Sequence, residues 1–267
     1  MNYQDQPLFK PPVWTWEIPT YFFVGGAAGA AAVIGVAAQV AGEDEKLIRD
    51  ARWIAAIGAN LSTPLLIADL GRPGRFLNML RVFNPQSPMS VGAWTVAVFG
   101  GASTATLLLP IFAPLSALTG LGMATYTGVL LGVTAIPVWK ENARVLPVHF
   151  AASALGTACS LLELRGHKQR ALSSLALGAA LFETAAPIEE GALMKTAGVL
   201  SGPVPFVLRL IGRRKAAAAA TILGSLLTRF AWVEAGRVSS RRSASTTSGP
   251  AASAATAAPP AQTPDRT

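Results

Sequence analysis

Residues 69–94, DLGRPGRFLNMLRVFNPQSPMSVGAW, separate two apolar segments that are each long enough to cross a lipid bilayer. The stretch carries three arginines and the run NPQSP at positions 84–88, which is rich in chain breakers. The backbone N–H and C=O groups of such a stretch would find no partners in lipid, so it must lie at a membrane surface. We therefore predict a polar platform held between two transmembrane helices, with more room for a specific contact than any other loop.

The composition of the whole chain agrees with a membrane location. Of its 267 residues, 51% are hydrophobic and 13% are charged, and the mean hydropathy is +0.43. A soluble domain carries about 25% charged residues, so we predict an integral membrane protein. The net charge of +8 comes from lysines and arginines between apolar runs, where they meet lipid headgroups, and it does not indicate binding to nucleic acid.

The apolar runs predict an all-α integral membrane fold with eight transmembrane helices, arranged as two four-helix bundles. The expected helices are residues 19–41, 48–67, 91–112, 116–138, 147–164, 171–186, 192–211 and 216–232. Each is near the ~20 residues that a bilayer core requires, and the seventh is interrupted by Pro203 and Pro205.

Three regions follow from this pattern. Residues 1–16 form an interfacial N-terminal arm, in which Trp14 and Trp16 suit the headgroup belt. Residues 17–237 form the membrane domain. Residues 238–267, rich in Ala, Ser, Thr and Pro, are expected to be a disordered tail. No cleaved signal peptide is expected, because the first apolar run lacks a basic start and a small-residue cleavage pattern.

Several short motifs occur in order along the chain. They are Trp14-x-Trp16 with Tyr21 and Gly25-Gly26-x-x-Gly29, Asp69-Leu70-Gly71-Arg72-Pro73-x-Arg75-Phe76, Ser87-Pro88-Met89-Ser90-x-Gly92-x-Trp94, Tyr126-Thr127-Gly128, and Pro137-x-Trp139. Together they resemble the NrfD/polysulphide reductase membrane-subunit family, most clearly over residues 14–163.

The resemblance implies a multi-pass protein of the cell (inner) membrane that exchanges electrons with menaquinone or ubiquinone. Its implied partners are a four-cluster iron-sulfur protein and a molybdopterin (Mo or W) catalytic subunit, as in formate dehydrogenases or polysulphide reductases. The chain itself offers no haem, iron-sulfur or other metal site, because it has one cysteine, Cys159, and two histidines, His149 and His167. His167 lies in a charged turn and is expected to face solvent.

The candidate quinone-binding residues are Tyr126, Tyr21, Glu17, Trp139 and His149. By resemblance Tyr126 matches the family's quinone-binding tyrosine, whereas Tyr21 stands where the better-known polysulphide reductase subunit has a histidine. Glu17, Tyr21, Trp139 and His149 are expected near one membrane level, so that the set converges on one pocket. The structural alternatives are a core tyrosine bonded to a carbonyl, a helix-start carboxylate and an interfacial histidine.

Asp69, Glu163 and Glu183 are the candidate proton-transfer residues, since ionisable groups in transmembrane segments are functional candidates by default. The alternatives are an ion pair of Asp69 with Arg72 or Arg75, and snorkelling of the two glutamates to an interface.

Partner docking is expected at the platform, through Arg72, Arg75, Asn84, Ser87 and Ser90. A rigid Pro-rich surface does not have to be ordered on binding. Headgroup binding by the arginines is the alternative.

Two other functions stay open at the sequence level. A transporter or ion channel would carry charges in the middle of several helices, or paired broken helices in two repeats. A structural scaffold would bind partners but no quinone.

Overall fold

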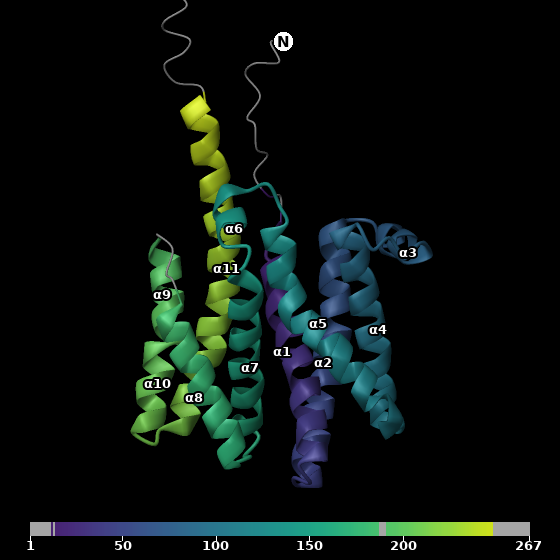
Figure 1. The fold of residues 1–267 in the computed structure, drawn as a ribbon, viewed down its shortest axis with the longest axis vertical. Coiled ribbons are helices and arrows are strands. Elements are labelled where there is room, and N and C mark those ends of the chain that lie inside the picture. The colour runs from purple at the N-terminus through teal and green to yellow at the C-terminus, as the bar shows by residue number, and fades with distance from the viewer. Residues whose placement is uncertain (1–11, 13, 187–190, 248–267) are drawn as a thin grey trace, which may run out of the picture.

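The computed structural model describes residues 12, 14–186 and 191–247, and within these residues it contains helices and no strands (Figure 1). The helices are α1 (Glu17–Val40), α2 (Glu45–Leu70), α3 (Pro73–Arg81), α4 (Pro88–Leu108), η2 (Pro110–Phe112), α5 (Ala113–Gly132), α6 (Pro137–Glu141), α7 (Leu146–Leu164), α8 (Arg170–Ala185), α9 (Ala192–Ser201), α10 (Pro203–Leu210) and α11 (Arg214–Thr247). The predicted all-helical class is therefore confirmed for the described residues.

The long helices pack as two groups that meet along α1, α5 and α7 (Figure 1). The first group contains α1, α2, α4 and α5, and the second contains α7 to α11. Small residues allow α1 to approach its neighbours closely. A Cβ added at Gly29 of α1 would collide with the carbonyl of Gly120 in α5, and one added at Gly58 of α2 would lie 2.6 Å from the Cβ of Ala28.

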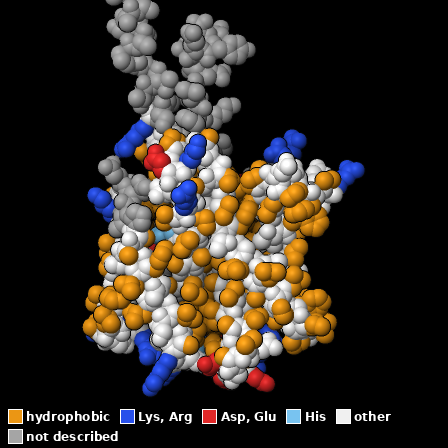
Figure 2. All heavy atoms as spheres, viewed as in Figure 1, with side chains coloured by type: hydrophobic (Ala, Val, Ile, Leu, Met, Phe, Trp, Pro, Cys, Tyr) orange, Lys and Arg blue, Asp and Glu red, His pale blue; other side chains and the backbone are white. Residues whose placement is uncertain are grey.

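Five helical segments are long and apolar enough to cross a membrane, namely α1, α2, α4, η2 with α5, and α11. The predicted count of eight is not confirmed, because α7, α8 and the α9–α10 segment are not among the five. At ~1.5 Å per residue the 16 residues of α8 span only about 24 Å. Figure 2 shows hydrophobic side chains over the middle of the visible face and charged side chains toward both ends, as a multi-pass membrane protein requires.

The platform is not a loop throughout. Gly71 ends α2 with a left-handed backbone (φ 68°), and α3 begins directly afterwards with Pro73 in its first turn. Ser87 then caps α4, because its side chain accepts a hydrogen bond from the backbone N–H of Ser90. The platform therefore consists of a short helix and a capped turn. Its prolines start helices as well as breaking them.

Two predicted boundaries change in the second group. The predicted seventh helix divides into α9 and α10 at Gly202, as its prolines indicated. The tail predicted from residue 238 begins too early, because α11 continues as a helix to Thr247. The polar stretch extends a helix that has already formed, so it avoids the cost of starting a new one. Residues 248–267, and residues 1–11 and 13 of the predicted arm, lie outside the described residues.

Candidate functional site

A cavity of about 270 Å³ lies among α1, α2, α4 and α5 at the end that carries the platform. Its wall is mostly apolar and includes Ile18, Phe22 and Leu66. The polar groups that line it include Tyr21, Tyr126 and Asp69, so three of the predicted site residues come together here. A larger cavity of about 570 Å³ borders residues 191–194 and α11, and none of the predicted site residues lines it.

Tyr126 reaches the cavity from α5. Its hydroxyl donates a hydrogen bond to the carbonyl of Pro88, in the first turn of α4. The ring lies against Gly92, where an added Cβ would stand 2.5 Å from the ring carbon Cε1. Glycine at position 92 therefore makes the room that Tyr126 occupies.

Tyr21 faces the same cavity from α1 and is only 2% exposed. No hydrogen bond to its hydroxyl is present within the described part of the chain, so this O–H is available to a ligand. Asp69 stands near the end of α2, lines the cavity and is half-buried. Its carboxyl therefore connects the cavity with the platform surface.

Trp139 and Glu17 do not line the cavity. Trp139 is fully buried behind it, donates through Nε1 to the carbonyl of Trp232 at 2.7 Å, and stacks on Trp14. Trp14 is the residue that forms the cavity wall, whereas Trp16 is 61% exposed. Only Trp16 therefore suits the predicted headgroup position. The Glu17 carboxylate accepts a hydrogen bond from Thr15.

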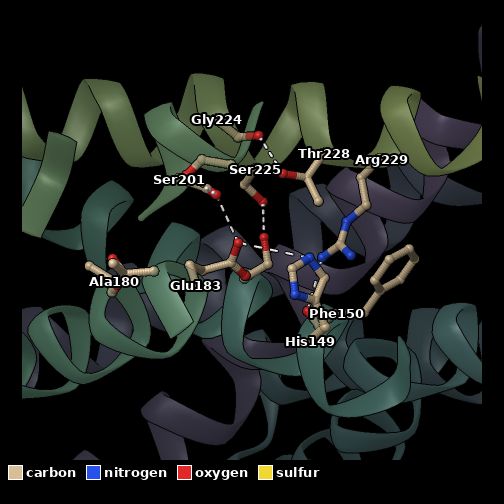
Figure 3. Close-up of polar contacts among 12 residues, drawn as sticks. His149, Phe150, Ala180, Glu183, Ser201, Gly224, Ser225, Thr228 and Arg229 are labelled. Atoms are coloured by element: carbon tan, nitrogen blue, oxygen red, sulfur yellow. Dashed lines mark hydrogen bonds and ion pairs between the residues drawn. The ribbon is translucent and has the colours of Figure 1, made fainter. Parts of the chain in front are cut away.

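His149 lies in the second helix group and does not line the cavity, so the predicted convergence of all five quinone residues is wrong. The side of α7 that carries His149 faces α8 instead, and His149 Nε2 lies 3.8 Å from Glu183 Oε2 (Figure 3). Arg229 of α11 donates to the carbonyl of Phe150 at 2.9 Å and covers its ring, with Cζ 3.8 Å from the centroid. Arg229 was not among the predicted site residues, although it is the one charged residue in the predicted eighth helix.

The other charged candidates are paired inside the protein. Glu163 binds Arg209 of α10 at 2.7 Å, and the two side chains are 3% and 5% exposed, so Glu163 does not snorkel. Glu183 is buried as well. The expectation that His167 faces solvent is also wrong, because it is buried and its Nε2 lies 2.9 Å from Asp50.

The platform residues divide into exposed and structural ones. Arg72, Arg75 and Asn84 are exposed, and Arg75 donates to the carbonyl of Leu70 at 3.0 Å rather than to Asp69. Ser90 is buried, accepts from the backbone N–H of Asn84 at 3.0 Å, and is thus unavailable to a partner. Ser87 serves as the helix cap described above.

The comparison with known families covers the part of the chain that carries most of the cavity and the platform. Residues 5–109 match the family described as polysulphide reductase, NrfD, which supports the resemblance predicted from the motifs. The matched part contains Tyr21, Asp69 and Gly92 and the whole platform, and it ends before Tyr126. No curated protein matches the chain.

Proposed function

Since the chain carries a polysulphide reductase NrfD domain over residues 5–109, we propose that it is a quinone-reactive anchor subunit of an oxidoreductase complex. NrfD proteins are membrane subunits of such complexes, which supports the anchor role. In this proposal the protein exchanges electrons between the iron-sulfur clusters of a partner and menaquinone or ubiquinone of the inner membrane. The quinone is a bound substrate, and the partners are a four-cluster iron-sulfur protein and a molybdopterin (Mo or W) subunit.

The observation that carries the proposal is the pairing of Tyr21 and Tyr126 in one apolar cavity beside the platform. A quinone ring needs an apolar slot and hydrogen-bond partners for its carbonyls. The volume of about 270 Å³ is close to the lower end of small-molecule sites, ~300 Å³, which suits a ring whose tail extends into lipid.

Each polar residue has a separate task. Tyr21 donates its free O–H to one quinone carbonyl. Tyr126 exchanges the Pro88 carbonyl for a second quinone oxygen, at small cost because Pro88 also accepts a bond within α4. Asp69 passes protons between the quinone and the platform side. Trp14, backed by Trp139, supplies a flat face against the ring.

The platform is the proposed docking surface for the iron-sulfur partner. Arg72, Arg75 and Asn84 are exposed next to the end of α2 that carries Asp69, so a cluster docked there would lie over the cavity. In the same proposal α7, α8 and the α9–α10 pair complete eight crossings with the five longer segments.

Binding of the quinone is tested by tryptophan fluorescence, because Trp14 lines the cavity and a bound quinone quenches it. Purified protein in detergent is titrated with decylubiquinone and with menadione. We expect saturable quenching, and Tyr21→Phe or Tyr126→Phe should weaken it roughly 2–10-fold, the worth of one hydrogen bond. Thr125→Val is the matched control, since it removes a hydroxyl bonded only to its own helix.

Equal, non-saturating quenching in all four proteins would rule out a quinone site in this cavity and favour a scaffold or transporter. The partners are tested separately, by mild extraction of the tagged protein followed by mass spectrometry and metal analysis. Recovery of iron with molybdenum or tungsten is expected, and a metal-free protein extracted alone contradicts the docking proposal.

A further inference from the structure

A second cluster of ionisable groups lies inside the other helix group, apart from the cavity. His149 of α7, Glu183 of α8 and Arg229 of α11 are all buried there (Figure 3). Three helices thus each bring one ionisable side chain to the same interior point. Such groups are costly in a membrane domain and mark functional sites by default.

This cluster has unused hydrogen-bonding capacity. The 3.8 Å between His149 Nε2 and Glu183 Oε2 is too long for a direct hydrogen bond. Among the described residues, His149 Nε2, Glu183 Oε1, and Nε and Nη1 of Arg229 have no hydrogen-bond partner. A cluster that served only to join helices would leave fewer such groups, because a buried polar atom without a partner destabilises the fold. The unpartnered atoms of His149 and Glu183 can therefore accept and release a proton.

A line of hydroxyl groups leads away from the cluster. Ser201 donates to Glu183 Oε2 at 2.8 Å, and Ser153 and Ser225 share a hydrogen bond of 2.8 Å. The hydroxyl of Thr157 comes one turn later and donates to the backbone carbonyl of Ser153 at 2.9 Å, so water would have to join it to the Ser153 hydroxyl. Positions 149, 153, 157 and 160 lie on one face of α7, so the line follows this helix toward its C-terminal end.

The line ends at a second buried pair. Arg209 donates to Glu163 Oε2 at 2.7 Å and to Ser160 at 3.2 Å, and Ser173 donates to Glu163 Oε1 at 3.2 Å. Glu163 is the next-to-last residue of α7, whereas His149 is in its first turn. The two clusters therefore stand at opposite ends of the same helix.

We propose that α7, α8 and α11 enclose a proton-transfer path that joins the His149–Glu183 cluster to the Glu163–Arg209 pair. A proton taken up at one cluster is matched by one released at the other, and the hydroxyls between them exchange O–H bonds without net change. The inference rests on the proposed function, since quinone turnover would drive the protons. The charged groups that face Glu183 are His149 from α7 and Arg229 from α11, whereas α9 contributes the hydroxyl of Ser201.

The path has no room for water at its Glu183 end. The small pocket lined by Ser153, Gly156, Glu183, Ser201 and Ser225 has essentially no volume (≈ 0 Å³) for a water molecule. Ordered water would complete the line only when the helices separate, so protons would move during turnover and not leak at rest.

The test uses the complex purified from its membrane and reconstituted in liposomes that contain the pH dye pyranine. Two molecules of reduced benzyl viologen supply two electrons to decylubiquinone, which takes up two protons and becomes the quinol. Viologen absorbance reports electron transfer and pyranine reports protons. In the wild type, more protons should move per electron pair than the quinone consumes.

Glu183→Gln should retain electron transfer and lose the protons beyond those of the quinone. The double variant Ser153→Ala with Ser225→Ala removes both partners of a buried bond without leaving one unpaired, and it should show the same loss even if Glu183→Gln does not fold. Glu45→Gln, an exposed residue at the start of α2, is the control and should match the wild type.

The outcomes separate the two proposals. Wild-type electron transfer without extra protons, or an unchanged proton ratio in the serine double variant, overturns the proton path and leaves the quinone function standing. Absence of quinone-dependent electron transfer in the wild type refutes the proposed function, and the inference with it.

Discussion

The indole rings of Trp14 and Trp139 stack with their centroids 5.4 Å apart and their planes 16° apart. This contact joins the segment before α1 to α6, and it places Trp14 where it forms a wall of the cavity. The fully buried Trp139 is held in turn by the carbonyl of Trp232.

Trp139→Ala should therefore destabilise the protein by about 3–5 kcal/mol, the usual cost of deleting a buried tryptophan side chain. It should also weaken quinone binding, because Trp14 loses its support. Thermal unfolding in detergent measures the first effect. Trp53→Ala is the control, since Trp53 is 48% exposed, and equal destabilisation by the two changes would contradict the role given to Trp139.

Gly92→Ala should weaken quinone binding by moving Tyr126. The new methyl group would stand 2.5 Å from Cε1 of the tyrosine ring, closer than real contacts allow. Gly101→Ala, on the same helix, meets nothing within 4 Å and should leave binding unchanged while favouring the helix. The fluorescence titration compares them, and equal affinities would show that Tyr126 is not held by this contact.

The Glu163–Arg209 pair should behave as a buried ion pair. Glu163→Gln or Arg209→Met alone should cost about 3–5 kcal/mol, because each leaves its partner charged and unpaired in the interior. The double variant should recover much of that loss, since it removes both charges together. Unfolding free energies from all four proteins form a double-mutant cycle. Strict additivity would mean that the two side chains do not interact.

Asp50 joins the two helix groups at the end opposite the platform. Its carboxylate accepts hydrogen bonds from Arg165 at 2.9 Å and lies 2.9 Å from His167 Nε2, both in the turn between α7 and α8. Asp50→Ala should cost about 1–3 kcal/mol by leaving His167 buried without its partner. The backbone amides of this turn should then exchange hydrogen faster. Arg49→Ala, at an exposed neighbouring position, should leave both the stability and this exchange rate unchanged.

Much of the fold followed from local sequence signals. Apolar runs located α1, α2, α7 and α8 to within three residues, and Pro203 and Pro205 marked the break between α9 and α10. Local signals were weaker where one residue type serves two purposes. Pro73 looked like a loop residue but begins α3, and the polar stretch after residue 238 continues α11.

The candidate site was predictable where residues share one helix group. Of the five residues expected to share a quinone pocket, Tyr21 and Tyr126 line one cavity, and Asp69, expected to transfer protons, lines it as well. His149 was misplaced because a membrane level can be inferred from the sequence, whereas the side of the helix that faces a given neighbour cannot. The serines of the second group gave no signal of their own, because one hydroxyl on an apolar helix is ordinary.

The sequence by itself determined that this is a helical membrane protein with a polar platform, because composition and hydrophobic run length act locally and need no partner. Motifs that keep their order along the chain also indicated the NrfD resemblance, with which the family match over residues 5–109 agrees. Only the tertiary structure decided that Tyr21 and Tyr126 share a cavity whereas His149 meets Glu183 and Arg229. That outcome depends on the rotation of each helix about its own axis, which is set by packing between small residues such as Gly29 and Gly120.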